Sequence, residues 1–294
     1  MATSATFKKF LDATKYDSRV LGRMERHVLT RPRDESRRTD VFHPSQMAKD
    51  SWCHRATYFE LLGHKPLEAK GRNGLSTQRV FDTGHAIHAA WQSLFAESGN
   101  LYGVWGCWHK DCKERQWGMP YPECSRGHGP LTIYKEVPLA IDDLKFGGHA
   151  DGWLIGFGDP VLLEIKSVGE GTFRWEAPEL MYTDDGNVDW MDAWDKLSMP
   201  FTSHIMQAQI YLKLLEIIHE RDPFPHTPPQ EIFFLYENKA NQTQKEFFIR
   251  KDDWGIKQKF EAVYMILECI KNNTPPSCNV NAVEQCGACK GFAA

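Results

Sequence analysis

Apolar positions along this chain follow two periods, one helical and one strand-like, and their succession predicts an α/β fold. The stretch SQMAKDSWCHRATYFELLG opens with Ser45, a residue suited to begin a helix, and spaces its apolar residues as helices do. The same spacing runs from Ser76 to about Ser98. We therefore expect two short helices and then a long one. Gly84 inside the long helix indicates close packing or a site, because an internal glycine costs a helix about 1 kcal/mol relative to alanine.

The middle of the chain changes to the alternation that strands show. Three strands are predicted, the first two forming a hairpin, at TIYKEVPLAI, FGGHADGWLIGF and PVLLEIKSV. Further along, helices are predicted at HIMQAQIYLKLLEIIHE and DDWGIKQKFEAVYMILECIKNN, with strands between them at EIFFLYENK and KEFFIR. Residues 103–130 and 168–200 lack a clear period. We expect the first segment to be an inserted metal-binding loop and the second to be a long loop.

Composition favours an ordinary globular protein. The chain has 294 residues, of which 41% are hydrophobic and 25% charged, which excludes disordered and collagen-like classes. This length suits one large domain or a core with an inserted module. No stretch approaches the roughly 20 apolar residues that span a bilayer, and the opening residues lack the apolar core of a signal peptide. We therefore expect a cytoplasmic protein without a membrane partner.

The net charge of −4 means that a nucleic-acid surface requires local clustering of Lys and Arg. Residues 1–42 form such a candidate, a basic N-terminal arm in which acidic residues are interleaved with Arg19, Arg23, Arg26, Arg31, Arg33, Arg37 and Arg38. The alternative is a solvated helix and loop.

Asp151, Glu164 and Lys166 form the candidate catalytic group. Asp151 stands at the head of a predicted strand, and Glu164 and Lys166 are two residues apart on the next, so their side chains leave the same face of the sheet. Burying them on so apolar a strand costs several kcal/mol unless they are paired or bind a cation. A divalent cation held by carboxylates supplies the hydroxide and the counter-charge that phosphodiester hydrolysis needs. The alternative is a structural ion pair at a solvent-facing edge.

Asp151 followed by Glu164-Ile165-Lys166 resembles the signature of the PD-(D/E)XK nuclease superfamily, in particular its RecB-like group. The resemblance implies that residues 43–294 form a restriction-endonuclease-like core, a central mixed β-sheet flanked by helices. It implies that Asp151, Glu164 and the carbonyl group of Ile165 bind Mg²⁺ or Mn²⁺. It further implies that Lys166 positions or activates the attacking water.

Two other motifs resemble the same group. Gly84-His-Ala-Ile-His88 is similar to the GxxxH motif whose histidine reaches the metal, which implies His88 as a ligand and favours Mn²⁺, with His85 as the less favoured choice. Gln207-x3-Tyr211 is similar to the QxxxY motif, in which both side chains lie on one helix face near the active site. Ordinary amphipathic helices are the alternative for both. Tyr236-Glu-Asn-Lys239 also resembles phage relatives, with Lys239 either at a phosphate or simply on the surface.

The eight cysteines, in a chain without an export signal, indicate metal ligands or buried thiols rather than disulfides. One upstream and three C-terminal cysteines resemble the iron–sulfur nucleases of the AddB type and the fourth CRISPR-associated family, which implies a [4Fe–4S] cluster on Cys53, Cys278, Cys286 and Cys289. The CxRxxYF surroundings of Cys53 match, whereas the C-terminal spacing departs, because a gap of seven precedes the CxxC. Zinc at the same cysteines and free thiols are the alternatives.

A second set of ligands, with the spacing C-x4-C-x11-C-x3-H, consists of Cys107, Cys112, Cys124 and His128. Four N/S ligands in two pairs suit structural zinc, with His109 competing for the fourth position and a metal-free loop as the alternative. Cys269 lies in the apolar helix AVYMILECI, where we expect a buried, inert thiol.

The resemblance implies a metal-dependent deoxyribonuclease of a phage or bacterium. The first hypothesis is an exonuclease acting on DNA ends or single strands in recombination, repair or DNA processing, beside a helicase, recombinase or annealing protein. Trp153, Trp175 and Tyr211 are candidates to stack on bases. The alternatives are a structure-specific endonuclease, a catalytically idle nucleic-acid-binding scaffold of the same fold, and a zinc-dependent regulator that binds through residues 103–130.

Overall fold

The computed structural model describes residues 20–32, 38–65, 74–183, 186–281, 283 and 285–292. Contacts divide the chain into one unit of residues 1–37 and 69–85 and another of residues 38–68 and 86–294. In the smaller unit, α2 (Leu21–Thr30) is an exposed helix, and its Glu25 accepts a hydrogen bond from the backbone N–H of Leu75 at 2.8 Å. Leu75 begins the long helix α5 (Leu75–Glu97), whose second half belongs to the larger unit.

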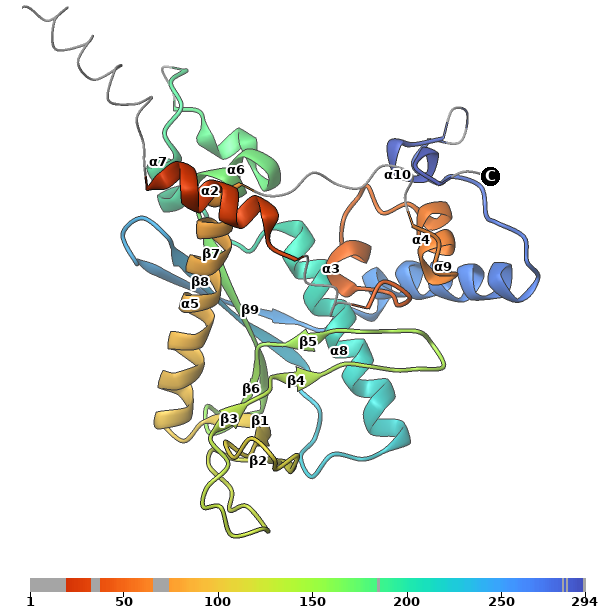
Figure 1. Cartoon of the computed structure of the whole chain (residues 1–294). Coiled ribbons are helices and arrows are strands. Elements are labelled where there is room, and N and C mark those ends of the chain that lie inside the picture. Colours follow the sequence, from red (N-terminus) through yellow and green to blue (C-terminus); the bar gives the residue numbers. More distant parts are fainter. Residues whose placement is uncertain are drawn as a thin grey trace, which may run out of the picture. The chain divides into compact units, whose positions relative to one another are not determined.

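The larger unit is built on a mixed sheet (Figure 1) with the strand order β2-β1-β6-β7-β8-β9, and β3 also pairs with β1. The strands are β1 (Leu101–Gly106), β2 (Arg115–Gly118), β3 (Ile133–Tyr134), β6 (Gly152–Leu154), β7 (Val161–Val168), β8 (Glu231–Asn238) and β9 (Gln244–Arg250). The β7–β8 pair is parallel and every other pair in the sheet is antiparallel. β7 and β8 therefore stand at its centre, between β6 and β9.

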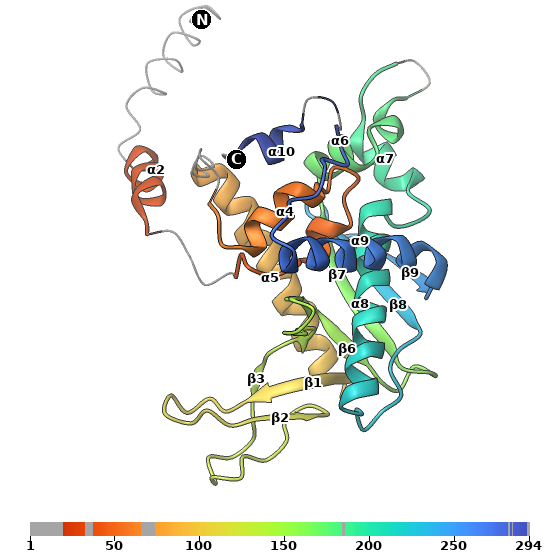
Figure 2. The ribbon, with the colours of Figure 1, turned by 90° about the vertical axis from the view of Figure 1, so that its right-hand side faces the viewer.

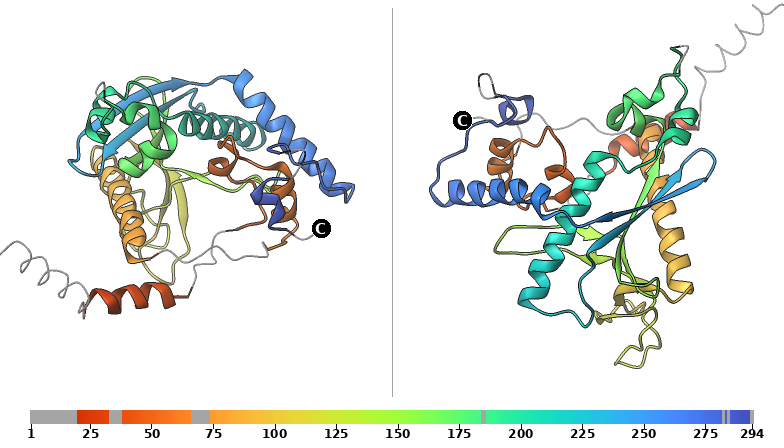
Figure 3. Two further views of the ribbon diagram at one scale, coloured as in Figure 1. Left: turned by 90° about the horizontal axis from the view of Figure 1, so that it is seen from above. Right: turned by 180° about the vertical axis from the view of Figure 1, so that it is seen from behind.

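Helices cover both faces of this sheet, with α5 on one side and α8 (Thr202–Arg221) on the other (Figures 1, 2 and 3). Alternation along β7 separates two cores: Leu163 and Ile165 pack in the cluster that includes Trp91 of α5, whereas Leu162 packs in the cluster of α8. Trp91 also donates a 2.6 Å hydrogen bond from Nε1 to Glu237 at the end of β8. Glu164 and Lys166 share the face of Leu162, which turns them toward α8.

Further helices extend the α8 side. α9 (Asp253–Lys271) packs against α8 and α4 (His54–Leu61), and the short α10 (Gly287–Lys290) packs against α4 (Figure 2). α3 (Pro44–Met47) packs on α8. No helix in the described part of the chain is both long and apolar enough to cross a membrane.

The fold is mixed α/β with a central mixed sheet flanked by helices, as the sequence indicated. The predicted hairpin is present as the antiparallel pair β4 (Val137–Pro138) and β5 (His149–Ala150). The predicted first strand is nevertheless divided: residues 133–134 pair with β1 instead, and Glu136 between the two pieces has a positive φ of 58°. The left-handed backbone at Glu136 ends the pairing with β1 and redirects the chain, so that the next residues pair with β5.

Two segments differ from the predictions. The segment 103–130 is not wholly an inserted loop, because β1 is a fully buried strand of the sheet and β2 pairs with it. Its sequence, LYGVWG, is buried on both faces and therefore shows no alternation. The segment 168–200 is not a loop either, since it holds α6 (Glu170–Glu176), the 3-10 helix η1 (Pro178–Met181) and α7 (Trp190–Lys196). Each is too short to show a helical period.

The close approach of β1, β6 and β7 depends on Gly152. A Cβ atom there would lie 2.7 Å from Leu101 Cδ1 and 3.1 Å from Leu163 Cδ2, and both leucines are fully buried. We expect Gly152→Ala to destabilise the protein by about 1–3 kcal/mol through overpacking. In α6, Gly171→Ala is the matched control, because nothing lies within 4 Å of its Cβ position and helical alanine is favoured. Equal thermal midpoints for the two variants would contradict this packing account.

Candidate functional site

Asp151 lies between β5 and β6 and is tied to the middle of β7. Its Oδ2 accepts a 2.6 Å hydrogen bond from the backbone N–H of Ile165, and its Oδ1 lies 3.0 Å from Nδ1 of His88 on α5. Only 9% of Asp151 is exposed. The carboxylate is thus held at a fixed place between the central strand and α5.

Glu164 and Lys166 form an ion pair on the α8 face of β7. Lys166 Nζ lies 2.6 Å from Glu164 Oε1 and donates a second hydrogen bond, at 3.1 Å, to the Oε1 of Gln207. Gln207 Nε2 donates to Glu164 Oε1 at 3.2 Å and to the hydroxyl of Tyr211, one helical turn further along, at 2.6 Å. The amide of Gln207 therefore fixes both members of the pair, and the structure brings these four predicted residues together.

The surroundings of Glu164 compensate the charge of its carboxylate only in part. Burial raises the pKa of its carboxyl group to about 7, against the lowering effect of Lys166, and the charge of Asp151 raises it further. Its Oε2 is buried and has no hydrogen-bond partner among the described residues. A buried carboxylate oxygen without a partner costs stability, and a cation at this point would satisfy it.

The residues around Oε2 suit a divalent metal ion. His88 Nδ1 and Asp151 Oδ1 are 3.0 Å apart, which equals the edge of an octahedron of ligands about 2.1 Å from Mg²⁺. Burial lowers the pKa of His88, but the hydrogen bond and the charge of Asp151 outweigh that effect, so the pKa is raised overall. Asp151 and His88 also lie close enough to Glu164 for their charges to shift the pKa of its carboxyl group, and carboxylates with an imidazole are donors that Mg²⁺ or Mn²⁺ accepts.

Glu136 is a third carboxylate near this point, and the sequence did not single it out. Gln92 Nε2 donates to the backbone carbonyl of Asp151 at 2.9 Å and to Glu136 Oε1 at 3.4 Å. Burial and the charge of Asp151 raise the pKa of Glu136. Its position results from the left-handed backbone at residue 136, for which the sequence TIYKEVPLAI offered no signal.

The first cysteine set gathers at the end of the β1–β2 ribbon. Cys107 follows β1, Cys112 precedes β2, and Cys124 and His128 lie in the turn after it. Cys112 Sγ lies 3.9 Å from Cys124 Sγ, and His128 Nδ1 lies 3.5 Å and 3.7 Å from the sulfurs of Cys107 and Cys124. The four ligand atoms lie within 4.8 Å of one another, so this group can hold a metal ion. His109 stacks on the ring of His128, with centroids 4.4 Å apart, and is not in the group.

The second set joins residues distant in sequence, and its four sulfurs also lie within 4.8 Å of one another. Cys53 directly precedes α4 and Cys278 follows α9, while Cys286 directly precedes α10 and Cys289 lies within it. Cys278 Sγ accepts from the backbone N–H groups of Asn281 at 3.3 Å and Cys286 at 3.4 Å. Burial raises the pKa of the Cys278 thiol, but these backbone donors outweigh it and lower the pKa to about 6.

Other predicted residues lie elsewhere. The proposed stacking of bases on Trp153 and Tyr211 is wrong in this structure, because Trp153 is fully buried and Tyr211 is only 5% exposed; Trp175 is 88% exposed. Cys269 is only partly buried, so its description as a buried thiol was also wrong. Lys239 directly follows β8 and donates its backbone N–H to the carbonyl of Val168 at 2.8 Å, and burial lowers the pKa of its ammonium group. His85 is exposed and belongs to the smaller unit.

The predicted basic arm is described only in part. Arg19, Arg33 and Arg37 lie outside the described residues. Arg38 pairs with Asp40 at 3.0 Å and with Asp142 at 3.4 Å, so its guanidinium group is used within the larger unit.

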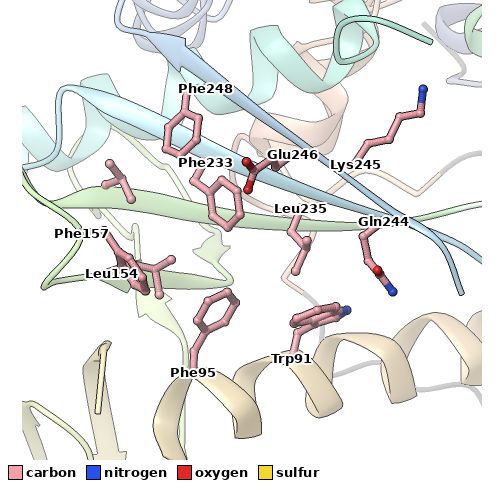
Figure 4. Close-up of a pocket in the computed structure, with 11 residues that line it drawn as sticks. Trp91, Phe95, Leu154, Phe157, Phe233, Leu235, Gln244, Lys245, Glu246 and Phe248 are labelled. Atoms are coloured by element: carbon pink, nitrogen blue, oxygen red, sulfur yellow. The ribbon is translucent and has the colours of Figure 1, made fainter. Parts of the chain in front are cut away.

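A cavity of about 470 Å³ lies on the α5 side of the sheet. Figure 4 shows Trp91 and Phe95 of α5 facing Leu235 and Phe233 of β8 across it, with Phe248 of β9 beyond. Phe233 and Leu235 alternate with Phe234, which pairs with Glu164, so they point to the opposite face of the sheet. This apolar cavity is therefore separate from the carboxylates.

No family model matches this sequence, and no curated protein matches it. Similar solved structures include the crystal structure of SSO0001, with 13% identity over 86% of each chain and a TM-score of 0.33. An alkaline exonuclease (LHK-Exo) from Laribacter hongkongensis has 14% identity over 80% of this chain and 90% of that chain, with a TM-score of 0.41. LHK-Exo in complex with dAMP matches with the same identity and coverage and a TM-score of 0.40. Structural similarity at this level does not support a functional assignment. The function is therefore inferred from the geometry of the site.

The raised pKa of Glu164 predicts a pH-dependent stability. Because the folded-state pKa of about 7 exceeds the ordinary value of 4.5, ionised Glu164 destabilises the fold fully above pH 7, and this penalty disappears as pH falls below 4.5. Without added Mg²⁺ or Mn²⁺, Glu164→Gln should raise the thermal midpoint at pH 8 by several degrees and leave it unchanged at pH 4. Calorimetry measures this, and no chelator is added, because a chelator would also act on the two cysteine sets that can hold a metal ion.

Glu179→Gln is the matched control, since Glu179 is exposed. It should leave the midpoint unchanged at both pH values. A lower midpoint for Glu164→Gln than for wild type at pH 8 would show that the ion pair with Lys166 outweighs the burial cost, against this account.

Proposed function

We propose that this chain is a metal-dependent DNA nuclease with a PD-(D/E)XK core. The observation that carries the proposal is the buried, unpartnered Oε2 of Glu164, in a site where Lys166 holds the other oxygen of the same carboxylate. A structural ion pair at a solvent-facing edge would leave that oxygen in water. Asp151 and His88 contact each other and their charges act on Glu164, which supports a bound cation rather than a purely structural role.

Asp151, Glu164, His88 and the carbonyl group of Ile165 would hold Mg²⁺ or Mn²⁺. When bound, such an ion lowers the pKa of a coordinated water and neutralises charge on the phosphate. Asp151 is held for this task by the N–H of Ile165, and its Oδ1 lies beside Nδ1 of His88. The catalytic residues are thereby placed before any substrate arrives, which lowers the cost of reaching the reactive geometry.

Lys166 is the residue we assign to the attacking water. Its ammonium group is held by Glu164 and Gln207, and an ammonium group has a third N–H to donate. That donor can orient a water molecule for attack in line with the scissile bond and stabilise charge on the phosphate. Gln207 and Tyr211 act as positioning residues, because their hydrogen bonds fix the Glu164–Lys166 pair.

The substrate we propose is DNA at its ends or in single strands, cut exonucleolytically in recombination, repair or DNA processing. Trp175, the exposed tryptophan on α6 directly after β7, is the remaining stacking candidate. Lys239 directly follows the neighbouring strand β8 and is the candidate to contact a phosphate. We also propose zinc at Cys107, Cys112, Cys124 and His128, where it would fix the β1–β2 ribbon.

Cleavage of end-labelled single- and double-stranded DNA tests the proposal. With Mn²⁺ or Mg²⁺, the wild type should release label from an end, and it should do so only when metal is added. Lys166→Ala should cut at least about 100-fold more slowly, in line with the loss of a group that positions a proton or water, while still binding DNA. Asp151→Ala should lose metal affinity and cleavage together.

Lys257→Ala is the matched control, since Lys257 lies on α9 and is 71% exposed, and it should cut as wild type does. Release of internal fragments from circular or flapped DNA would assign a structure-specific endonuclease instead. DNA binding without cleavage of any linear, flapped or circular substrate would assign an idle scaffold. Equal cleavage by Lys166→Ala and wild type would refute the assigned centre.

A further inference from the structure

The four thiols at the C-terminal end of the larger unit stand as close together as the ligands of one ion. Cys53 Sγ lies 3.8 Å from Cys278 Sγ, and Cys286 Sγ lies 3.7 Å from Cys289 Sγ. Sulfurs about 2.3 Å from a tetrahedral zinc ion are separated by about 3.8 Å along each edge of the tetrahedron. All four sulfurs lie within 4.8 Å of one another, which leaves room for a single ion at their centre.

A [4Fe–4S] cluster requires a wider arrangement. Each of its four thiolates binds a different iron, so the whole iron–sulfide core lies between the sulfurs and holds them further apart than the ligands of one ion. The observed pairs at 3.7 Å and 3.8 Å do not fit that core. The sequence also departs from the iron–sulfur pattern that the upstream cysteine resembles. The departure is the gap of seven residues between Cys278 and Cys286.

The other cysteine set provides an internal comparison. Around a tetrahedral zinc ion, one sulfur and one imidazole nitrogen are separated by about 3.6 Å. His128 Nδ1 lies 3.5 Å and 3.7 Å from two of its sulfurs, and the Cys112–Cys124 distance is 3.9 Å. The same packing of donors occurs at both sets, although one joins neighbours in sequence and the other joins residues 225 positions apart. A shared geometry indicates a shared kind of occupant.

Hydrogen bonds that do not involve sulfur hold two of the four cysteines, Cys53 and Cys278, in place. Asn279 accepts from the N–H of His54 at 2.7 Å and donates to the carbonyl of Trp52 at 2.9 Å, and Arg55 donates to the carbonyl of Pro276 at 3.2 Å. These bonds hold Cys278 beside Cys53 without a metal ion. Around Cys286 and Cys289 the described chain offers less support: a backbone hydrogen bond from Gln285 to Asn281 at 3.1 Å, the four-residue helix α10, and the stacking of Phe292 on Phe59.

We infer that Cys53, Cys278, Cys286 and Cys289 bind one tetrahedral zinc ion rather than a [4Fe–4S] cluster, and that this ion fastens α10 to α4. The site is closed: four protein thiolates complete the coordination, and three of the four cysteines are buried. It is therefore structural and takes no part in chemistry. The inference is independent of the proposed nuclease activity, because it concerns metal content and local stability.

The test is the metal content of full-length protein purified without oxygen from cells supplied with both iron and zinc. We expect about two zinc ions per chain, no acid-labile sulfide and no visible colour, since both sites take the tetrahedral N/S coordination of structural zinc. Exchange into Co²⁺ should give the intense visible bands of tetrahedral cobalt–thiolate. Four irons with sulfide would overturn the inference, and one iron without sulfide would overturn the identity of the ion.

Single variants locate the two ions. Cys286→Ser, at the partly exposed ligand, should lose one zinc ion and make the segment after Asn279 sensitive to limited proteolysis, while Cys124→Ser should lose the other ion and leave that segment protected. Cys269→Ser is the matched control and should keep both ions. If Cys286→Ser does not fold, the metal content of the wild type still decides between zinc and the cluster. Unchanged zinc content in folded Cys286→Ser would contradict the site.

Discussion

The burial of Glu164 in the central strand β7 is the constraint on which the site depends. Burying a carboxylate beside a parallel strand pair is unfavourable, and the surroundings offset only part of that cost: Lys166 pairs with one oxygen, and Gln207 from α8 supports both residues. The second oxygen stays without a partner among the described residues. A protein that needed only stability would place an apolar residue here, as it does at Leu162 and Val168.

Because side chains alternate along each strand, the two faces of the sheet have different roles. On one face of β7, Leu163 and Ile165 pack with α5 in an apolar core. On the other, Glu164 and Lys166 meet Gln207 and Tyr211 of α8. Asp151 links the two, because it binds the backbone of Ile165 and contacts His88 on α5. The two cysteine sets stand apart from this centre, one beyond β1 and β2 and the other between α4 and α10.

Much of this arrangement was predictable from the sequence, for physical reasons that differ from residue to residue. The period of two along VLLEIKSV placed Glu164 and Lys166 on one face, the helical turn placed Gln207 and Tyr211 on one helix face, and the resemblance to the QxxxY motif implied that this face lies near the site. The spacing C-x4-C-x11-C-x3-H predicted the first ligand group, and the resemblance to the iron–sulfur nucleases implied the second. What the sequence did not reveal depends on backbone conformation and tertiary pairing: the left-handed Glu136 that divides a strand, the buried β1 without alternation, and the short helices between residues 170 and 196. The separation of the four sulfurs, which favours zinc over a cluster, is likewise a property of the folded chain.

Diffraction from crystals soaked in MnCl₂ tests the central claim most directly, because the anomalous signal of manganese locates the ion without any assumption about substrate. The account predicts a peak at ligand distance from Asp151 and from the unpartnered oxygen of Glu164, and no peak there in crystals of Glu164→Gln. A wild-type map without a peak at these carboxylates would contradict the claim that Glu164 is buried in order to bind a cation.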